Sequence, residues 1–160
     1  MFSLRPAIPA DVPVVLGLIR ELAEYERLPH EVAATEESLR ETLFGARPYA
    51  EALVAEADGE VAGFAVFFHN YSTFVGRPGL YLEDLYVRPQ FRRRGIGRAF
   101  FRELARLAVE RGCGRIEWSV LDWNEPALAF YRGLGATPMS DWTVQRLAGA
   151  ALEAMAADGG

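Results

Sequence analysis

The sequence predicts an α/β fold in which one mixed sheet carries helices on both faces, within a single domain of residues 1–160. The first indication is a pair of strand-like segments joined by Asp58-Gly59, a dipeptide that favours the tight turn between antiparallel strands. The second is the later half of the chain, where strand and helix patterns alternate, which is the order that builds parallel strand pairs. A chain of this length has room for one hydrophobic core.

The first half of the chain is expected to contribute three strands and two helices. Residues 2–5 form a short edge strand, and apolar residues recur at helical spacing after Asp11, a candidate helix N-cap. Residues 35–44 are expected to form a second short helix, because polar residues able to cap it stand at its start. Two strands follow on either side of the tight turn, over residues 50–57 and 61–68.

The second half is expected to alternate between strands and helices. Residues 80–87 form the next strand, and strict alternation places Leu80, Leu82, Asp84 and Tyr86 on one face. A helix is expected over residues 96–111, because its apolar residues lie on one stripe and its arginines lie roughly opposite. The remaining elements are expected in the order strand 116–121, helix 124–134 with Asn124 as its N-cap, and strand 142–147.

The composition argues against several function classes. The formal net charge is −5, whereas a nucleic-acid surface needs a basic face. Cys113 is the only cysteine, so an intrachain disulfide is impossible, and no spacing of cysteine and histidine suggests a metal site. Residues 1–9 lack the pattern of a secretory signal, and the apolar stretch 12–19 is too short to span a bilayer. We therefore expect a cytoplasmic protein with no membrane, nucleic-acid or metal partner.

Residues 92–98 form an arginine- and glycine-rich turn between a strand and a helix. Gly95 and Gly97 lack a Cβ atom, so backbone N–H groups at the helix start can approach a pyrophosphate closely. A Walker A loop is excluded because the chain has no lysine, and a dinucleotide fingerprint would need glycine in place of Phe100. The turn therefore predicts another phosphate-bearing ligand, with a solvated basic turn as the structural alternative. The candidate ligand-binding residues are Arg92, Arg93, Arg94, Gly95, Ile96, Gly97 and Arg98.

The pattern Arg-x-x-Gly-x-Gly within this turn resembles the coenzyme A loop of the GNAT N-acetyltransferases. Residues 18–26, 81–87 and 120–124 look like the diamine branch of that superfamily, which includes spermidine/spermine and thialysine acetyltransferases. The resemblance covers nearly the whole chain. It implies the GNAT fold, in which a central, mostly antiparallel twisted sheet contains a splayed parallel pair. It also implies acetyl-CoA as the co-substrate, no metal, and a homodimer.

The chemistry of amine acetylation assigns two catalytic roles. A lysine-like primary amine has a pKa of about 10.4, so it must lose a proton before it can attack a thioester. Glu83 can accept that proton directly or through a water, and the matching glutamate of the resembled enzymes is linked to this task. The acid tyrosine of the family falls at Tyr131, which can donate a proton to the departing thiolate. As alternatives, Glu83 pairs with an arginine and Tyr131 is a core aromatic residue. No covalent acetyl-enzyme is needed, and Cys113 is interpreted as structural.

The resemblance also implies the remainder of the site. Asn124 contacts the pantetheine arm, and the strand that holds Leu85 and Val87 offers backbone groups to the cofactor. This strand is expected to part from its neighbour near a bulge, so that the Leu85 N–H polarises the thioester carbonyl. The candidate substrate-binding residues are Glu26, Glu83, Asp84 and Trp123, although strand alternation turns Asp84 away from Glu83.

The chain is therefore predicted to move an acetyl group from acetyl-CoA to a primary amine of a small molecule, by direct attack in a ternary complex. Ser72 stands where an acid would stand in a polyamine-type enzyme, which favours a short diamine or a thialysine-like amino acid over spermine. Two alternatives stay open. The chain acetylates a protein or peptide amine, or it is a non-catalytic sensor that binds acyl-CoA.

Overall fold

The structure is a computed structural model that describes residues 1–159. The chain divides into two compact units, Met1–Leu121 and Asp122–Gly160. The first unit contains the whole sheet of the described chain, and the second contains helices. That residues 1–160 act as a single domain stays a prediction. None of the helices within residues 1–159 has the length and apolar character needed to cross a membrane.

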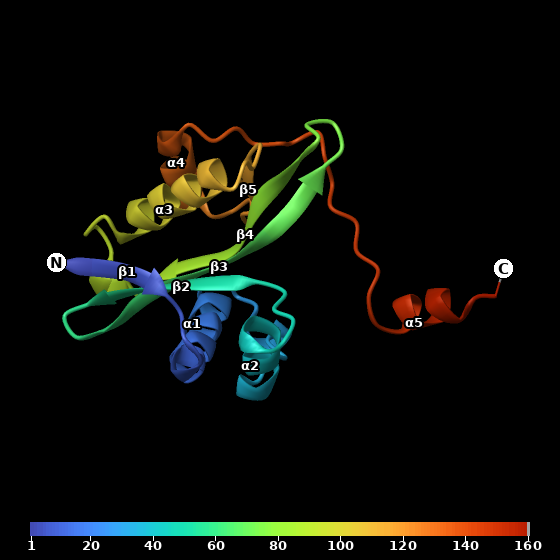
Figure 1. The fold of residues 1–160 in the computed structure, drawn as a ribbon, viewed down its shortest axis with the longest axis horizontal. Helices are drawn as coiled ribbons and strands as arrows, with labels where there is room; N and C mark the ends of the chain where they lie inside the picture. The colour runs from blue at the N-terminus through green and yellow to red at the C-terminus, as the bar shows by residue number, and fades with distance from the viewer. Residues whose placement is uncertain (160) are drawn as a thin grey trace. The chain divides into compact units, whose positions relative to one another are not determined.

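The first unit is built on one mixed sheet with the strand order β1-β2-β3-β4-β5 (Figure 1). The first four strands pair antiparallel, and β5 pairs with β4 in parallel after an intervening helix. The mixed sheet predicted from the sequence is therefore confirmed. The strands are β1 (Phe2–Pro6), β2 (Glu51–Ala57), β3 (Glu60–Ser72), β4 (Arg77–Val87) and β5 (Ile116–Trp118).

Helices cover both faces of this sheet, as predicted. α1 (Val12–Tyr25) and α2 (Glu36–Phe44) lie on one face, and α3 (Ile96–Glu110) lies on the other (Figure 1). α3 buries a single stripe of side chains, which is the pattern of an amphipathic helix against a sheet. The α1 face of the sheet holds a buried cluster that consists of Val15, Leu18, Val54, Phe64 and Tyr86.

The two turn signals in the first unit have different outcomes. The turn between β2 and β3 is as predicted, because φ is 53° at Asp58 and 82° at Gly59. Asp11 does occupy the N-cap position of α1, but its carboxylate makes no capping hydrogen bond to the helix. It accepts instead from the Ile8 N–H and pairs with Arg5 at 2.7 Å, which ties the start of α1 to β1.

The alternation predicted for residues 80–87 is wrong beyond Leu82. The pairing of β3 with β4 shifts so that Val66 faces Asp84 and Phe67 faces Leu82, which leaves Glu83 as an extra residue. Such a bulge exchanges the faces on which the following side chains lie. Asp84 and Tyr86 therefore lie on the α1 face, opposite to Leu80 and Leu82, with which alternation had grouped them. Leu82 stays on the α3 face with Phe67. The ring of Phe67 contacts Arg111, the C-cap residue of α3.

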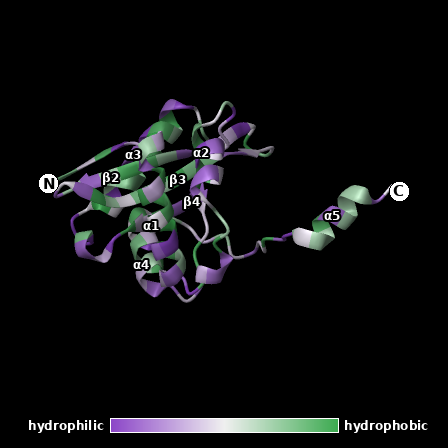
Figure 2. Cartoon of the chain, turned by 90° about the horizontal axis from the view of Figure 1, so that it is seen from below, coloured by the Kyte–Doolittle hydropathy of each residue, from purple (hydrophilic) through white to green (hydrophobic). Residues whose placement is uncertain are grey.

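The second unit contains α4 (Glu125–Leu134) and α5 (Gly149–Ala157). α4 is as predicted, with Asn124 at its N-cap accepting a hydrogen bond from the Ala127 N–H at 3.3 Å. α5 is a helix that the sequence patterns did not predict. Figure 2 shows it in mostly pale to green colours, and a helix that is apolar on most sides has no amphipathic stripe to reveal it.

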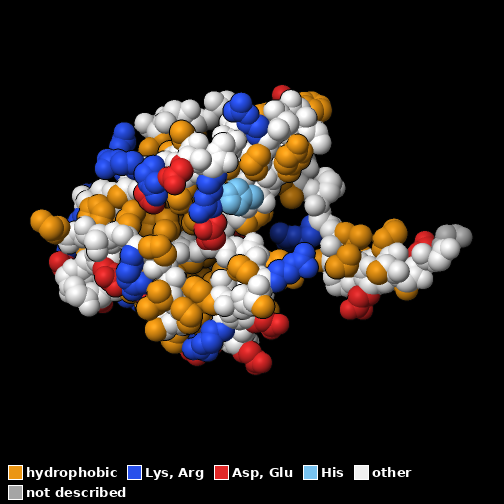
Figure 3. Space-filling model, viewed as in Figure 1, with side chains coloured by type: hydrophobic (Ala, Val, Ile, Leu, Met, Phe, Trp, Pro, Cys, Tyr) orange, Lys and Arg blue, Asp and Glu red, His pale blue; other side chains and the backbone are white. Residues whose placement is uncertain are grey.

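The strand predicted over residues 142–147 is wrong, because this segment forms no strand. Trp142 is 76% exposed and Val144 is 83% exposed, so the alternating apolar side chains are not buried against a sheet. Figure 3 shows hydrophobic side chains on the surface of the C-terminal segment. Alternating apolar residues describe a half-buried pleated surface, and they form a strand only where a sheet edge pairs with them.

Candidate functional site

Three carboxylates lie near one another in the first unit. Glu26 caps the C-terminal end of α1, Glu83 is the bulge residue of β4, and Asp84 follows it. The pKa of Asp84 is raised to about 6, first by burial and then by the negative charges of Glu83 and Glu26. Burial also raises the pKa of Glu26. The bulge thus brings Asp84 into one acidic cluster with Glu83, whereas alternation alone had placed the two side chains on opposite faces. A cation bound at this cluster would relieve the repulsion between the carboxylates.

The backbone after α1 fixes where Glu26 lies. Arg27 adopts a positive φ of 64°, and the Leu28 N–H reaches back to the Ala23 carbonyl at 2.8 Å. The Arg27 N–H bonds to the Glu24 carbonyl at 3.0 Å, so the helix ends in a Schellman motif. Non-glycine residues at positive φ are uncommon and often occur at functional sites.

Replacing Asp84 with asparagine is expected to raise the free energy of unfolding at pH 8 by up to about 3 kcal/mol. A carboxyl whose pKa rises on folding destabilises the folded state above its unfolded pKa, and the full penalty is present above its folded pKa, here about 6. The gain from Asp84→Asn should therefore be nearly constant from pH 8 to about pH 7 and shrink as the pH is lowered through about 6 towards 4. Urea unfolding at several pH values measures this change.

Asp11→Asn is the matched control with the opposite sign. The hydrogen bonds from Arg5 hold the pKa of Asp11 below its usual range, so its carboxylate stabilises the fold above the unfolded pKa. That stability is lost as the pH falls through the lowered folded pKa. Asp11→Asn should therefore destabilise the protein at pH 8, and a loss of stability in both variants at this pH would contradict the buried, repelled state of Asp84.

The arginine–glycine turn joins β4 to the start of α3. A short 3-10 turn over Pro89–Phe91 is followed by positive φ values of 63° at Arg93 and 85° at Gly95, which is the N-cap of α3. Ile96 is 1% exposed, so the first turn of α3 is anchored in the core. The first N–H groups of a helix have no helical partner, and left-handed residues before them direct further N–H groups towards an anion. This arrangement fits the pyrophosphate of a coenzyme A.

Arg92, the first residue of the turn, contacts the protein itself. Its Nε donates to the Val87 carbonyl at 2.9 Å. Its Cζ atom lies 5.3 Å from the ring centroid of Tyr25 and 5.6 Å from that of Tyr86. These contacts link the turn to α1 and to β4, a role that the sequence pattern did not indicate.

The other arginines of the turn differ in their surroundings. Arg94 pairs with Asp58 in the β2–β3 turn at 2.7 Å, and this exposed contact lowers the pKa of Asp58. Arg93 and Arg98 are both exposed, and Gly97 in the first turn of α3 is partly buried. Exposed guanidinium groups beside a helix N-terminus add positive charge where a phosphate would bind.

Among the described residues, no strand pairs with the β5-facing edge of β4 beyond Leu82, so this edge is open there. The parallel pairing of these two strands ends at Leu82 and Trp118, which is the splayed pair expected for the fold. On the opposite edge the Arg88 N–H donates to β3 at 2.9 Å. Because N–H groups alternate between the two edges of a strand, those of Leu85 and Val87 are directed towards the open edge. The open edge can therefore hydrogen-bond an extended ligand.

The second unit carries three of the residues predicted for the site. Trp123 is 42% exposed, whereas Asn124 is 7% exposed and fixed by its capping bond. Tyr131 lies in α4, and its ring centroid is 5.8 Å from that of Phe130. The capping role of Asn124 is confirmed, and the roles of all three residues towards ligands stay predictions.

Two contacts that the sequence did not predict join α1 to the segment between β4 and α3. Glu21 pairs with Arg88 at 3.1 Å, and Tyr25 contacts Arg92. Glu21 and Tyr25 are four residues apart, so their placement on one face of α1 was available from the sequence. Their partners, Arg88 and Arg92, could not be predicted, because a helical pattern does not indicate which strand the helix packs against.

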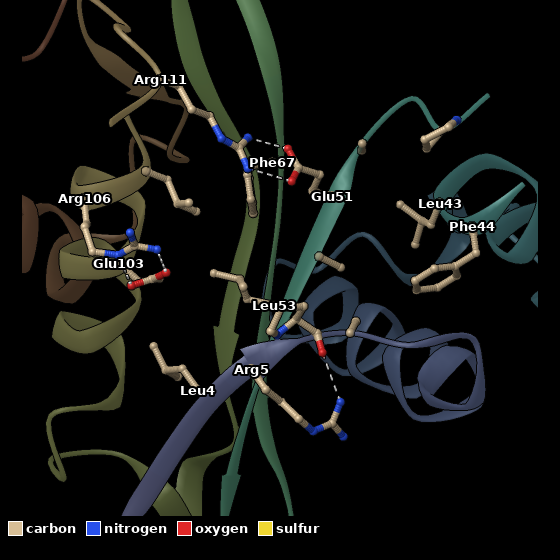
Figure 4. Close-up of a pocket in the computed structure, with 16 residues that line it drawn as sticks. Leu4, Arg5, Leu43, Phe44, Glu51, Leu53, Phe67, Glu103, Arg106 and Arg111 are labelled. Atoms are coloured by element: carbon tan, nitrogen blue, oxygen red, sulfur yellow. Dashed lines mark hydrogen bonds and ion pairs between the residues drawn. The ribbon is translucent and has the colours of Figure 1, made fainter. Parts of the chain in front are cut away.

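A cavity of about 420 Å³ lies elsewhere in the first unit, beside β1, β2 and the end of α3 (Figure 4). Arg111 and Glu51 form a two-point ion pair at 2.6 and 2.9 Å, and Leu53 and Phe67 contribute apolar lining. Its lining includes none of the residues predicted for the site. The cavity is therefore separate from the acidic cluster and from the turn.

Comparisons with known proteins agree with this geometry. The model of the Acetyltransferase (GNAT) family matches residues 18–136. Thialysine N-epsilon-acetyltransferase of Bos taurus is 40% identical over 164 residues, covering 96% of each chain. L-ornithine N5-acetyltransferase of Arabidopsis thaliana is 35% identical, covering 97% of this chain and 88% of that protein. A solved integron cassette protein of V. cholerae, at 24% identity, superposes with a TM-score of 0.81 over 98% of both chains and shows the shared fold.

The family match extends over three quarters of the chain and includes both the turn and the acidic cluster. Enzymes of this family use acetyl-CoA as co-substrate, and the turn before α3 fits its pyrophosphate. The chain therefore belongs to the Acetyltransferase (GNAT) family and is an N-acetyltransferase that uses acetyl-CoA.

Proposed function

We propose that the enzyme acetylates a primary amine of a short diamine, or of a basic amino acid such as thialysine or ornithine. The observation that carries the proposal is the cluster of Glu26, Glu83 and Asp84 beside the open edge of β4. Relatives at 40% and 35% identity are named for thialysine and ornithine, small molecules with two amino groups each. A substrate with two positive charges matches a site with three carboxyl groups.

Glu83 acts in this proposal as the general base. It is exposed at the bulge, where it can take a proton from the bound ammonium directly or through a water. Asp84 and Glu26 hold the second ammonium of the substrate, and Trp123 shapes the pocket. The neutral amine then attacks the thioester carbonyl directly in a ternary complex. A C–N bond forms, the C–S bond breaks, and no acetyl-enzyme is formed.

Acetyl-CoA, when bound, supplies the acetyl thioester. The turn of residues 92–98 holds the pyrophosphate, the backbone at Leu85 and Val87 holds the arm with Asn124, and the Leu85 N–H polarises the carbonyl. Tyr131 donates a hydrogen bond to the departing sulfur and completes proton transfer late. Full transfer from a phenol of pKa about 10 to a thiolate of pKa about 8.5 is uphill by about 2 kcal/mol.

An initial-rate assay of acetyl-CoA consumption over a panel of amines tests the proposal. The panel contains thialysine, ornithine, lysine, putrescine, spermidine, spermine and a peptide with a free N-terminus. We expect kcat/KM to be highest for thialysine, ornithine or putrescine, because Ser72 replaces an acid that a long polyamine would need. A preference for spermine or for the peptide would overturn the proposed substrate class.

We also propose that the enzyme is a homodimer and acts in the cytoplasm. Support for the dimer comes from apolar side chains exposed in the second unit, which an interface would cover: Trp142, Val144, Leu147, Leu152 and Met155. The single cysteine, which cannot form an intrachain disulfide, is compatible with a reducing compartment. Sedimentation equilibrium measures the mass, and a monomer at micromolar concentration would contradict the dimer.

A further inference from the structure

Two contacts join the second half of α1 to the segment between β4 and α3, which includes the cofactor turn. Glu21 pairs with Arg88, with distances of 3.1 Å to Nη2 and 3.2 Å to Nε. Four residues later, the ring of Tyr25 lies 5.3 Å from the Cζ atom of Arg92. Residues four apart share one face of a helix, so a single face of α1 makes both contacts. Glu26, the amine-site carboxylate of α1, follows Tyr25 directly in the chain.

Arg92 is held from β4 as well. Its Cζ atom lies 5.6 Å from the ring of Tyr86, and its Nε donates to the Val87 carbonyl at 2.9 Å. Tyr86 is 7% exposed and belongs to the core cluster on the α1 face. The guanidinium therefore contacts one ring from α1 and one from β4, and both contacts are attractive. Tyr25, by contrast, is 39% exposed, and its contact with Arg92 is the one that reaches the cofactor turn.

We propose that Tyr25 is a positioning residue through which the cofactor turn and the amine site are coupled. A pyrophosphate bound at the turn restrains Arg92, Arg92 restrains the ring of Tyr25, and the end of α1 then holds Glu26 at the amine site. The unfavourable free energy of ordering this segment is included in the binding of the first ligand, so the second ligand binds more tightly. Thermodynamic linkage requires the effect to be reciprocal. The identity of the amine rests on the proposed function, whereas the response of α1 to the cofactor does not.

Calorimetric titrations with coenzyme A and thialysine test the coupling, because without an acetyl group the two form a ternary complex that does not react. In the native enzyme, saturating coenzyme A should lower the Kd for thialysine by about fivefold or more, and thialysine should lower the Kd for coenzyme A by the same factor. Tyr25→Ala should bring both factors close to one. Tyr25→Phe keeps the ring face and should keep the coupling. Tyr49→Ala, which removes a tyrosine that is 70% exposed in the same unit, should also keep it.

Hydrogen exchange with coenzyme A alone gives a readout that does not depend on the amine. The amides of Glu26, Arg27 and Leu28 are hydrogen-bonded at the end of α1, and coenzyme A should slow their exchange in the native enzyme and in Tyr25→Phe, but not in Tyr25→Ala. Unchanged protection in the native enzyme, or equal protection in Tyr25→Ala, would overturn the coupling. If protection appears but no amine of the panel binds or reacts, the proposed substrate class fails and the positioning role stands.

Discussion

Replacing Glu83 with glutamine is expected to lower kcat/KM for the amine at pH 7 by about 10²–10⁴-fold, the usual contribution of a general base. Glutamine cannot accept a proton, so the variant can use only amine that is already neutral in solution. At pH values below the amine pKa of about 10.4, the neutral fraction rises about tenfold for each unit by which the pH is raised. The logarithm of kcat/KM for Glu83→Gln should therefore rise with pH with a slope of about one between pH 7 and pH 9. Initial rates over this range at constant ionic strength measure it.

Asp84→Asn is the control for the loss of a neighbouring negative charge. Asp84 lies beside Glu83 but is partly buried, and its proposed role is to hold the second ammonium group. Its removal should raise KM for a diamine more than it lowers kcat, and it should not reproduce the steep pH dependence of Glu83→Gln. If Glu83→Gln keeps the native rate at pH 7 while its thermal unfolding is unchanged, Glu83 is not the base.

The bulge at Glu83 shows where sequence reasoning about the site reached its limit. A period of two follows from strand geometry, and for residues 80–87 it assigned Asp84 to the face opposite Glu83. A bulge depends on how two strands pair, because the extra residue is defined only against its partner, here Val66 and Phe67 of β3. The resemblance to the family supplied the expectation of a bulge, but only the pairing located it. The acidic cluster is a consequence of that pairing.

Elements with a strong local signal were predicted closely. α3 begins and ends within a residue of its expected bounds, because its apolar stripe and the glycines at both ends are local features. The segment 142–147 alternates only from Trp142 to Gln145, and it forms no strand, because pairing depends on a distant edge. The contacts of Arg92 also depend on distant parts of the chain. Its position in the turn was visible from the sequence, whereas its contacts with Tyr25 and Tyr86 require the packing of α1 on the sheet.

Replacing Tyr131 with phenylalanine is expected to lower kcat by about 10- to 100-fold at pH 7, because the departing thiolate loses its hydrogen-bond donor. A thiol of pKa about 8.5 leaves increasingly well as a thiolate above that pH, so the defect should become smaller towards pH 9. The same substitution separates catalysis from packing. Phenylalanine keeps the ring that contacts Phe130, so a Tyr131 that serves only in packing would leave kcat unchanged. A loss of kcat with an unchanged melting temperature and an unchanged Kd for coenzyme A would place the hydroxyl of Tyr131 in the reaction itself.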